Sequence, residues 1–169
     1  SRVNIKRLVD NIRSGTNIYT PLIELTVNAI QAIEQKQEPG GKVTIQIKRD
    51  GTEDMLDRLQ AVDGFIVFDN GIGFTEPHRD SFDKVYTEQK LADGGKGFGR
   101  FTCLKYFQHV RVRSVFADGP VLKERKFNMG LDEDIIVGES VTVVEGRDCG
   151  AEVELSGIRS VKFPDKGIE

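Results

Sequence analysis

The clearest pattern of apolar and polar positions lies in residues 20–38, where no glycine or proline follows Pro21 until Pro39. This uninterrupted run predicts one long helix, with Thr20 as its N-cap and Pro21 as its first residue, because proline has no amide hydrogen to lose there. At about 100° per residue, the polar side chains fall on one narrow stripe, and apolar residues cover most of the remaining surface. We therefore expect a largely buried helix. The polar stripe consists of Glu24, Asn28, Gln31 and Gln35.

A polar stripe on such a helix needs a polar partner. A carboxylate and amides that faced a dry interior would cost on the order of a few kcal/mol. A bound, hydrated ligand would supply the partner, but Glu and Asn four residues apart also form an ordinary solvated helix face. The helix alone leaves both interpretations open.

The rest of the chain predicts strands, with helices before and between them. Residues 65–68 are continuously apolar and predict a central strand that is buried on both faces. Residues 5–12 predict a short amphipathic helix, and residues 50–64 an irregular surface excursion. Early helices followed by a late antiparallel run predict an α+β fold, a two-layer sandwich with helices on one face of a mixed, mostly antiparallel sheet. The other predicted strands are 43–48, 109–116, 121–127, 135–138, 141–145 and 152–155. The other predicted helices are 76–85 and one that residues 94–100 open and that runs through Leu104 and Tyr106.

Composition limits the function classes. A chain of 169 residues with 38% hydrophobic and 30% charged residues fits one domain with a sizeable core. The net charge of −3 gives no electrostatic case for nucleic acid as the main ligand. Cys103 and Cys149, with two His in the whole chain, do not suffice for a zinc site, and we interpret them as free thiols in a reducing compartment. No apolar run reaches membrane-spanning length, so we expect a cytoplasmic domain without a membrane partner.

Residues 69–73 (Asp-Asn-Gly-Ile-Gly) follow directly on the apolar run 65–68. An Asp at the end of a buried strand can accept a hydrogen bond from an exocyclic amine, and glycines let a flat ring approach the backbone closely. The same residues are also common in ordinary tight turns. This stretch too has two interpretations when it is taken alone.

Residues 94–100 (Gly-Gly-Lys-Gly-Phe-Gly-Arg) lead into a predicted helix. Free amides at a helix N-terminus favour phosphate, so the stretch predicts an anion cradle. It is not a Walker loop, because no Gly-Lys-Ser/Thr ends it. It is not a Rossmann loop either, because a polar segment precedes it and Arg111 and Arg113 lie downstream in place of an acidic residue.

The three stretches, in this order, resemble the nucleotide-binding boxes of the GHKL or Bergerat-fold ATPases, such as gyrase B subunits, HtpG-type chaperones, MutL proteins and histidine kinases. The resemblance covers nearly the whole chain. It implies one ATP-binding domain over residues 1–169, the N-terminal part of a longer protein, with ATP or ADP and Mg²⁺ as ligands. The boxes are Glu24-x-x-x-Asn28-Ala29, Asp69-x-Gly71-x-Gly73 and Gly95-x-Gly97-x-Gly99.

The resemblance also implies a role for the matching residues. Asn28 would hold Mg²⁺, Asp69 would bind the adenine amine, and Glu24 would be the catalytic general base that activates water. Residues 72–99 would form a lid over the nucleotide. The other expected nucleotide-binding residues are Ala32, Gly71, Gly73, Phe74, Lys90, Gly95, Lys96, Gly97, Phe98, Gly99, Arg100 and Ala151.

The sequence departs from the family at Ala151, where the last motif usually has Thr with its hydroxyl near the adenine. Glu24 favours ATP hydrolysis over protein-histidine phosphorylation, since histidine kinases commonly have Asn or His there. The expected function is therefore slow ATP hydrolysis that drives conformational change or an ATP-dependent homodimer, together with further domains of the same chain. The alternatives are a non-catalytic, nucleotide-gated interaction module, a histidine-kinase domain and a glycine-rich domain without a ligand.

Overall fold

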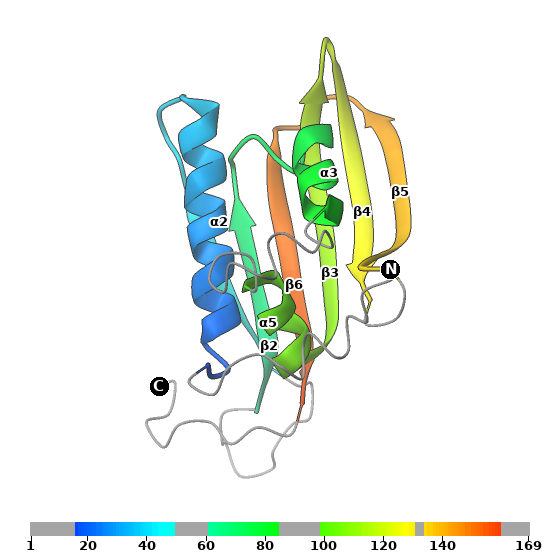
Figure 1. The fold of residues 1–169 in the computed structure, drawn as a ribbon. Coiled ribbons are helices and arrows are strands. Elements are labelled where there is room, and N and C mark those ends of the chain that lie inside the picture. Colours follow the sequence, from blue (N-terminus) through cyan, green and yellow to red (C-terminus); the bar gives the residue numbers. More distant parts are fainter. Residues whose placement is uncertain (1–15, 50–60, 85–98, 131–133, 160–169) are drawn as a thin grey trace.

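The computed structural model describes residues 16–49, 61–84, 99–130 and 134–159. Six strands form one open sheet in the order β1-β2-β6-β3-β4-β5, and every pairing of neighbours is antiparallel. Helices α2, α3 and α5 lie on one face of this sheet (Figure 1), which confirms the predicted α+β sandwich. The elements are α2 (Thr20–Lys36), β1 (Val43–Arg49), β2 (Val62–Asp69), α3 (Glu76–Lys84), α5 (Gly99–Tyr106), β3 (Phe107–Asp118), β4 (Val121–Met129), β5 (Ile136–Val144) and β6 (Gly150–Ile158).

Helix α2 confirms the long predicted helix but not its predicted cap. Tyr19 occupies the N-cap position and makes no side-chain cap hydrogen bond, so the assignment of Thr20 was wrong by one residue. The Thr20 hydroxyl instead accepts a hydrogen bond from the Asn17 backbone N–H at 3.0 Å, which closes the turn before the helix. Pro21 lies in the first turn as predicted, and Gln37 ends the helix in a left-handed conformation with φ 55°.

The predicted burial of α2 is wrong. Within this helix only Pro21 and Ala29 are buried. Ile23, Val27 and Ile30 are 62%, 44% and 45% exposed. The helix lies over the β1–β2 side of the sheet (Figure 1), so its inner side meets strands while its outer side faces solvent.

Strand β2 lies inside the sheet, next to its β1 edge, and the described helices cover only one of its faces. Phe65 and Val67 point towards the helices and are buried, whereas Ile66 and Phe68 are half-buried. The expectation of burial on both faces was therefore wrong, because the described helices cover a single face of the sheet. The buried aromatic and aliphatic side chains between β2, β3, β6 and α5 form the core.

The remaining differences concern segment boundaries. The two predicted strands around Gly138 are one strand, β5, in which Gly138 has φ +64°. The excursion predicted for residues 50–64 ends earlier, because β2 begins at Val62; its residues 50–60, like the helix predicted at 5–12, lie outside the described residues. None of the helices in the described ranges is long and apolar enough to cross a membrane.

The order of the strands positions the site. Strand β6, the last in the sequence, lies between β2 and β3. This insertion makes Ala151 the direct neighbour of Asp69 on one side and of Ser114 on the other. Asp69, Ser114 and Ala151, which are distant in the sequence, therefore lie side by side in the sheet.

Candidate functional site

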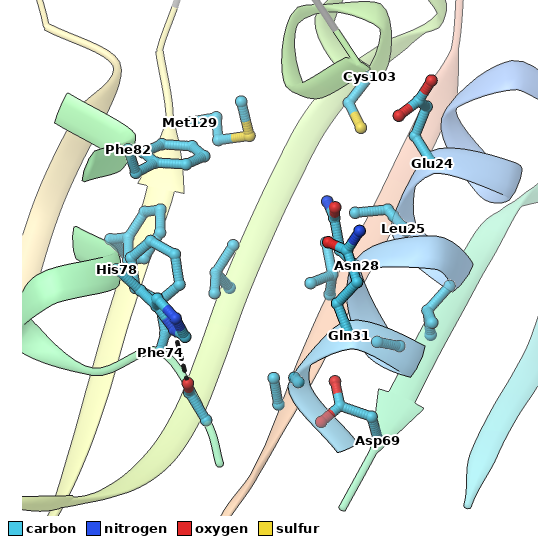
Figure 2. Close-up of a pocket in the computed structure, with 18 of the residues that line it drawn as sticks. Glu24, Leu25, Asn28, Gln31, Asp69, Phe74, His78, Phe82, Cys103 and Met129 are labelled. Carbon is cyan, nitrogen blue, oxygen red and sulfur yellow. Dashed lines mark hydrogen bonds between the residues drawn. The ribbon is translucent and has the colours of Figure 1, made fainter. Parts of the chain in front are cut away.

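A pocket of about 260 Å³ lies between α2 and α3, with the strands of the sheet as its floor. Figure 2 shows side chains from both helices facing each other across it. Strands β2, β3, β4 and β6 all contribute floor residues, and α5 closes one end with Cys103. The site is thus assembled from segments spread over most of the described chain.

The polar stripe of α2 forms one wall of the pocket. All four of its residues line the cavity and all four are exposed, so the stripe faces a ligand-sized space that is open to solvent. Going along the helix, Gln31 lies near Asp69, Asn28 comes one turn earlier, and Glu24 lies at the far end, beside Cys103 (Figure 2). Residues four apart lie one above the other on a helix, so Glu24 and Asn28 can act on the same ligand.

Asp69 lies at the opposite end of the pocket from Glu24. Burial raises the pKa of Asp69 above its ordinary value of 3.8, while hydrogen bonds from the backbone N–H groups of Gly71 and Ala151 lower it. The Gly71 N–H donates to Asp69 Oδ1 at 2.9 Å. An ionised carboxylate offers about four acceptor positions, so two backbone donors leave room for a ligand amine.

The turn after Asp69 is held by close backbone contacts at its glycines. A Cβ on Gly71 would come within 2.6 Å of the Ala32 carbonyl carbon, and the next amide, of Ile72, donates to the Ala32 carbonyl oxygen at 3.1 Å. Gly73 has φ +78°, and a Cβ there would lie 2.2 Å from the Val115 carbonyl oxygen. These glycines let the turn pack between α2 and β3.

Asn70 and Ser114 brace the same turn from two sides. The Asn70 side chain accepts from the Lys42 backbone N–H at 2.7 Å and donates to the Gly40 carbonyl at 2.9 Å. The buried Ser114 hydroxyl accepts from the Phe74 N–H at 2.7 Å and donates to the Gly150 carbonyl at 2.8 Å. Because these bonds occupy the polar groups of both side chains, we interpret them as supports of the site.

Helix α3 and the residue before it form the wall opposite α2. Phe74, His78 and Phe82 line the pocket there. The His78 Nδ1 atom lies 3.4 Å from the Gly73 carbonyl oxygen (Figure 2). Phe74 and Phe82 contact each other and Phe127 of β4, with ring centroids 5.5–5.9 Å apart. This wall is therefore mainly aromatic, whereas the α2 wall is polar.

Cys103 lies at the Glu24 end of the pocket. Burial raises the pKa of its thiol to about 12, and the neighbouring Glu24 charge contributes in the same direction. The thiol is therefore protonated at neutral pH and unreactive. Cys103 and Cys149 are both free, as predicted.

The structure brings several of the predicted site residues together as pocket lining, namely Glu24, Asn28, Ala32, Asp69, Gly73, Phe74 and Ala151. Gly71 supports the turn without lining the pocket. Gly99 and Arg100 begin α5. The remaining predicted residues, Lys90, Gly95, Lys96, Gly97 and Phe98, lie outside the described residues.

Sequence reasoning missed much of the pocket lining. Gln31 and Gln35 belonged to the recognised stripe, and strand alternation could have indicated the inward positions of β2, β3 and β6. His78 gave no signal, because a single His in a polar segment has no informative period. The missed lining residues are Leu25, Ala29, Val67, His78, Phe82, Cys103, Val112, Phe127, Met129 and Val153.

Three solved structures show a similar fold. The ATPase region of Saccharomyces cerevisiae topoisomerase II is 13% identical, with a TM-score of 0.50 over 81% of this chain and 37% of that chain. The ATPase and transducer domains of topoisomerase II from Balamuthia mandrillaris are 15% identical, with a TM-score of 0.50 over 83% and 37%. The yeast region bound to dexrazoxane is 13% identical, with a TM-score of 0.52 over 83% of this chain and 38% of that chain. The chain thus spans less than half of each neighbour.

Sequence comparison with curated proteins gives no match. The family described as histidine kinase-, DNA gyrase B- and HSP90-like ATPases matches residues 15–154, which is most of the chain. The match includes the three predicted boxes and the strands that form the pocket floor. The chain therefore belongs to the histidine kinase-, DNA gyrase B- and HSP90-like (GHKL) ATPase family.

Proposed function

We propose that this domain binds ATP with Mg²⁺ in the pocket between α2 and α3 and hydrolyses it, and that the cycle drives conformational change or dimerisation in a larger protein. The observation that carries the proposal is the shared pocket of Glu24, Asn28 and Asp69. Their spacing along the pocket gives the nucleotide a direction, with the base at Asp69 and the phosphates towards Glu24 (Figure 2).

The Asp69 end suits a purine. Its carboxylate accepts a hydrogen bond from an exocyclic amine, which adenine presents. The floor beside it is apolar, with Val67 from β2 and Ala151 and Val153 from β6. A flat apolar surface with one convergent polar group is typical of a site that orients an aromatic ring.

The Glu24 end suits phosphates and a metal ion. Helix α5 begins at Gly99, one turn before Cys103, and a helix N-terminus favours anions. Mg²⁺ usually takes one or two protein oxygens together with substrate phosphates and water. The Asn28 amide oxygen fits that role, and the described residues contain no cluster of three or more His, Cys, Asp or Glu that would replace it. Bound there, Mg²⁺ would neutralise phosphate charge.

Glu24 would act as the general base. It lies one turn from Asn28 on the same stripe, so a water between its carboxylate and the terminal phosphate can be oriented for in-line attack. The carboxylate takes the proton of that water, and the β-phosphate oxygen leaves with the electron pair of the broken bond. A positioned base contributes on the order of 10²–10⁴-fold to such a step.

Asp69→Asn tests the proposal directly. The amide is a poorer acceptor and can present a donor to the adenine amine, so we expect ATP affinity to fall by about 2–3 kcal/mol. Isothermal titration calorimetry with Mg-ATP measures the change. Asp63→Asn, on the same strand but outside the pocket, is the matched control and should bind as the wild type does. Unchanged affinity in a folded Asp69→Asn protein would remove this residue from the site.

A further inference from the structure

A buried arginine lies under the α3 wall of the pocket. Arg125 of β4 is 1% exposed. Its guanidinium carbon lies 4.9 Å from the centre of the Phe116 ring and 5.9 Å from that of Phe74. A charge taken this far from water is very costly unless it is paired. The partners of Arg125 therefore show which elements its ion pairs connect.

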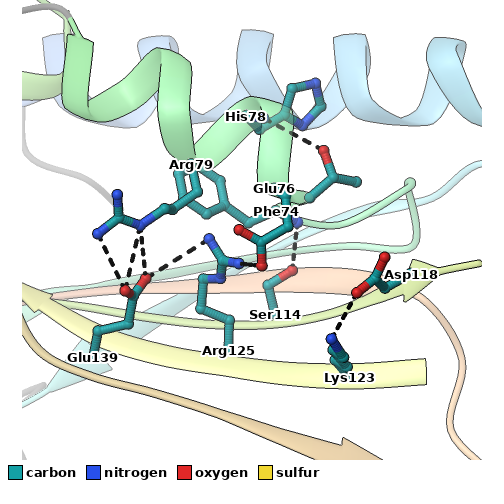
Figure 3. Close-up of polar contacts among 10 residues, drawn as sticks. Phe74, Glu76, His78, Arg79, Ser114, Asp118, Lys123, Arg125 and Glu139 are labelled. Carbon is teal, nitrogen blue, oxygen red and sulfur yellow. Dashed lines mark hydrogen bonds and ion pairs between the residues drawn. The ribbon is translucent and has the colours of Figure 1, made fainter. Parts of the chain in front are cut away.

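The partners of Arg125 come from two other elements. Its Nη2 atom donates to Glu76 Oε1 of α3, and its Nη1 atom lies 3.7 Å from Glu139 Oε2 of β5 (Figure 3). Glu139 also accepts hydrogen bonds from Arg79 of α3, with Nε to Oε2 at 3.2 Å. Two residues of α3 and two of the sheet thus form one chain of alternating charge. We call Glu76, Arg79, Arg125 and Glu139 the α3 clamp.

The arginine depends on these ion pairs. Within the described part of the chain, its Nε and Nη1 atoms have no hydrogen-bond partner. Removing a carboxylate would leave a buried charge with still less compensation, which is the strongly destabilising case for a buried ion pair. The clamp therefore fixes α3 to β4 and β5 more firmly than an exposed ion pair would.

In the described part of the chain, the apolar packing of helix α3 depends on one large side chain. Its nine residues, Glu-Pro-His-Arg-Asp-Ser-Phe-Asp-Lys, include Phe82 as their one large apolar side chain. Phe82 packs on Phe74 and Phe127, and all three rings line the pocket. His78 lines it from the same helix. A shift of α3 would therefore displace the wall that faces Asn28 and Asp69.

We propose that Arg125 is a positioning residue. Through Glu76 and Glu139 it holds α3 on the sheet, and so keeps the aromatic wall preorganised for the nucleotide. Preorganisation lowers the ordering cost of binding, so a loosened wall weakens affinity without removing any contact group. The effect on ATP rests on the proposed function, whereas the effect on α3 does not.

The test uses Glu139→Gln and Arg125→Met. Glu139→Gln keeps the side-chain shape but removes the charge shared by both arginines, and Arg125→Met replaces the cation by an apolar chain. We expect backbone hydrogen exchange in residues 76–84 to become faster in both variants while β2 and β6 stay unchanged. ATP affinity should fall by about 2- to 30-fold, the range of coupling through such networks. The double variant should weaken binding less than the two single effects combined, since both break one network.

Lys123→Met is the matched control. Lys123 lies two residues from Arg125 on β4 and forms an exposed ion pair with Asp118 at 2.6 Å. Its removal should change neither the exchange of α3 nor ATP affinity.

The proposal would be overturned if both test variants fold and α3 exchanges in them at the wild-type rate. It would also be overturned if Lys123→Met changes the exchange of α3 and the ATP affinity as the test variants do. If Arg125→Met does not fold, Glu139→Gln decides, because its half-buried side chain tolerates an amide. If the wild type binds no ATP, the proposed function fails, and the exchange of α3 decides the clamp by itself.

Discussion

Introducing a threonine at Ala151 tests the geometry of the proposed purine end of the pocket. Ala151 and Asp69 are direct Cα partners in the antiparallel pairing of β6 with β2, and both line the pocket. Side chains at such positions point to the same face, with Cβ atoms about 4.5–5.5 Å apart. The hydroxyl introduced by Ala151→Thr would therefore lie beside a purine bound to Asp69.

The expected gain follows from one hydrogen bond. A typical net contribution is about 0.5–1.5 kcal/mol, so ATP should bind about 2- to 12-fold more tightly to Ala151→Thr than to the wild type. Ala151→Val is the matched control, because valine has nearly the same shape and the same preference for a strand but no hydroxyl. It should show no gain, and any loss would measure the added bulk.

Calorimetric titration with Mg-ATP gives the affinities, and thermal unfolding followed by circular dichroism shows that each variant is folded. A valine variant that binds as tightly as the threonine variant would refute the reasoning, because the hydroxyl would then contribute nothing. Weaker binding by a folded threonine variant than by the valine variant would refute it as well.

Three further predictions concern the polar groups of the pocket. Glu24→Gln should keep ATP affinity while hydrolysis falls by about 10²–10⁴-fold, with Glu34→Gln on the same helix as a control. Equal hydrolysis in the full protein would exclude Glu24 as the base, and equal hydrolysis at the background rate would favour a nucleotide-gated module without catalysis. Asn28→Ala should weaken Mg-ATP binding and make the remainder insensitive to EDTA, and a wild-type response to EDTA would exclude Asn28 as a metal ligand. Because burial raises the pKa of Asp69 in the folded chain, its ionisation should cost folding stability as pH rises from 3.8 through the folded pKa, while ATP affinity increases over the same range. Thermal midpoints and ATP affinities are measured against pH in the wild type and in Asp69→Asn. In the variant, neither the fall in stability nor the rise in affinity over this pH range should appear.

The main polar groups of the candidate site, Glu24, Asn28 and Asp69, were predictable because their signals are local. Glu24 and Asn28 are one helical turn apart, so their common direction follows from the sequence once the helix is recognised. The position of Asp69 at the end of a strand follows from the apolar run before it. The order of the boxes then indicated the family, which the comparison confirmed.

Local sequence patterns did not predict correctly which residues of these elements are buried and which groups they bond. Ile23 and Ile30 are apolar in sequence, but they are exposed because α2 lies over one side of a single sheet and nothing in the described chain covers its outer face. Thr20 has the side chain of an N-cap, but its hydroxyl bonds to Asn17 instead. Periodicity predicts which residues share a face of an element and does not predict what that face meets.

The sequence by itself determined where the described helices and strands lie, apart from their boundaries and the continuity of β5, and which polar groups α2 and the end of β2 present. Only the tertiary structure decided that β6 enters between β2 and β3, which puts Ala151 beside Asp69. It also decided that Arg125 is buried between carboxylates from α3 and β5. The physical reason is the same in both cases. Strand order and buried ion pairs are set by contacts between segments far apart in the chain, and such contacts leave no period in the local sequence.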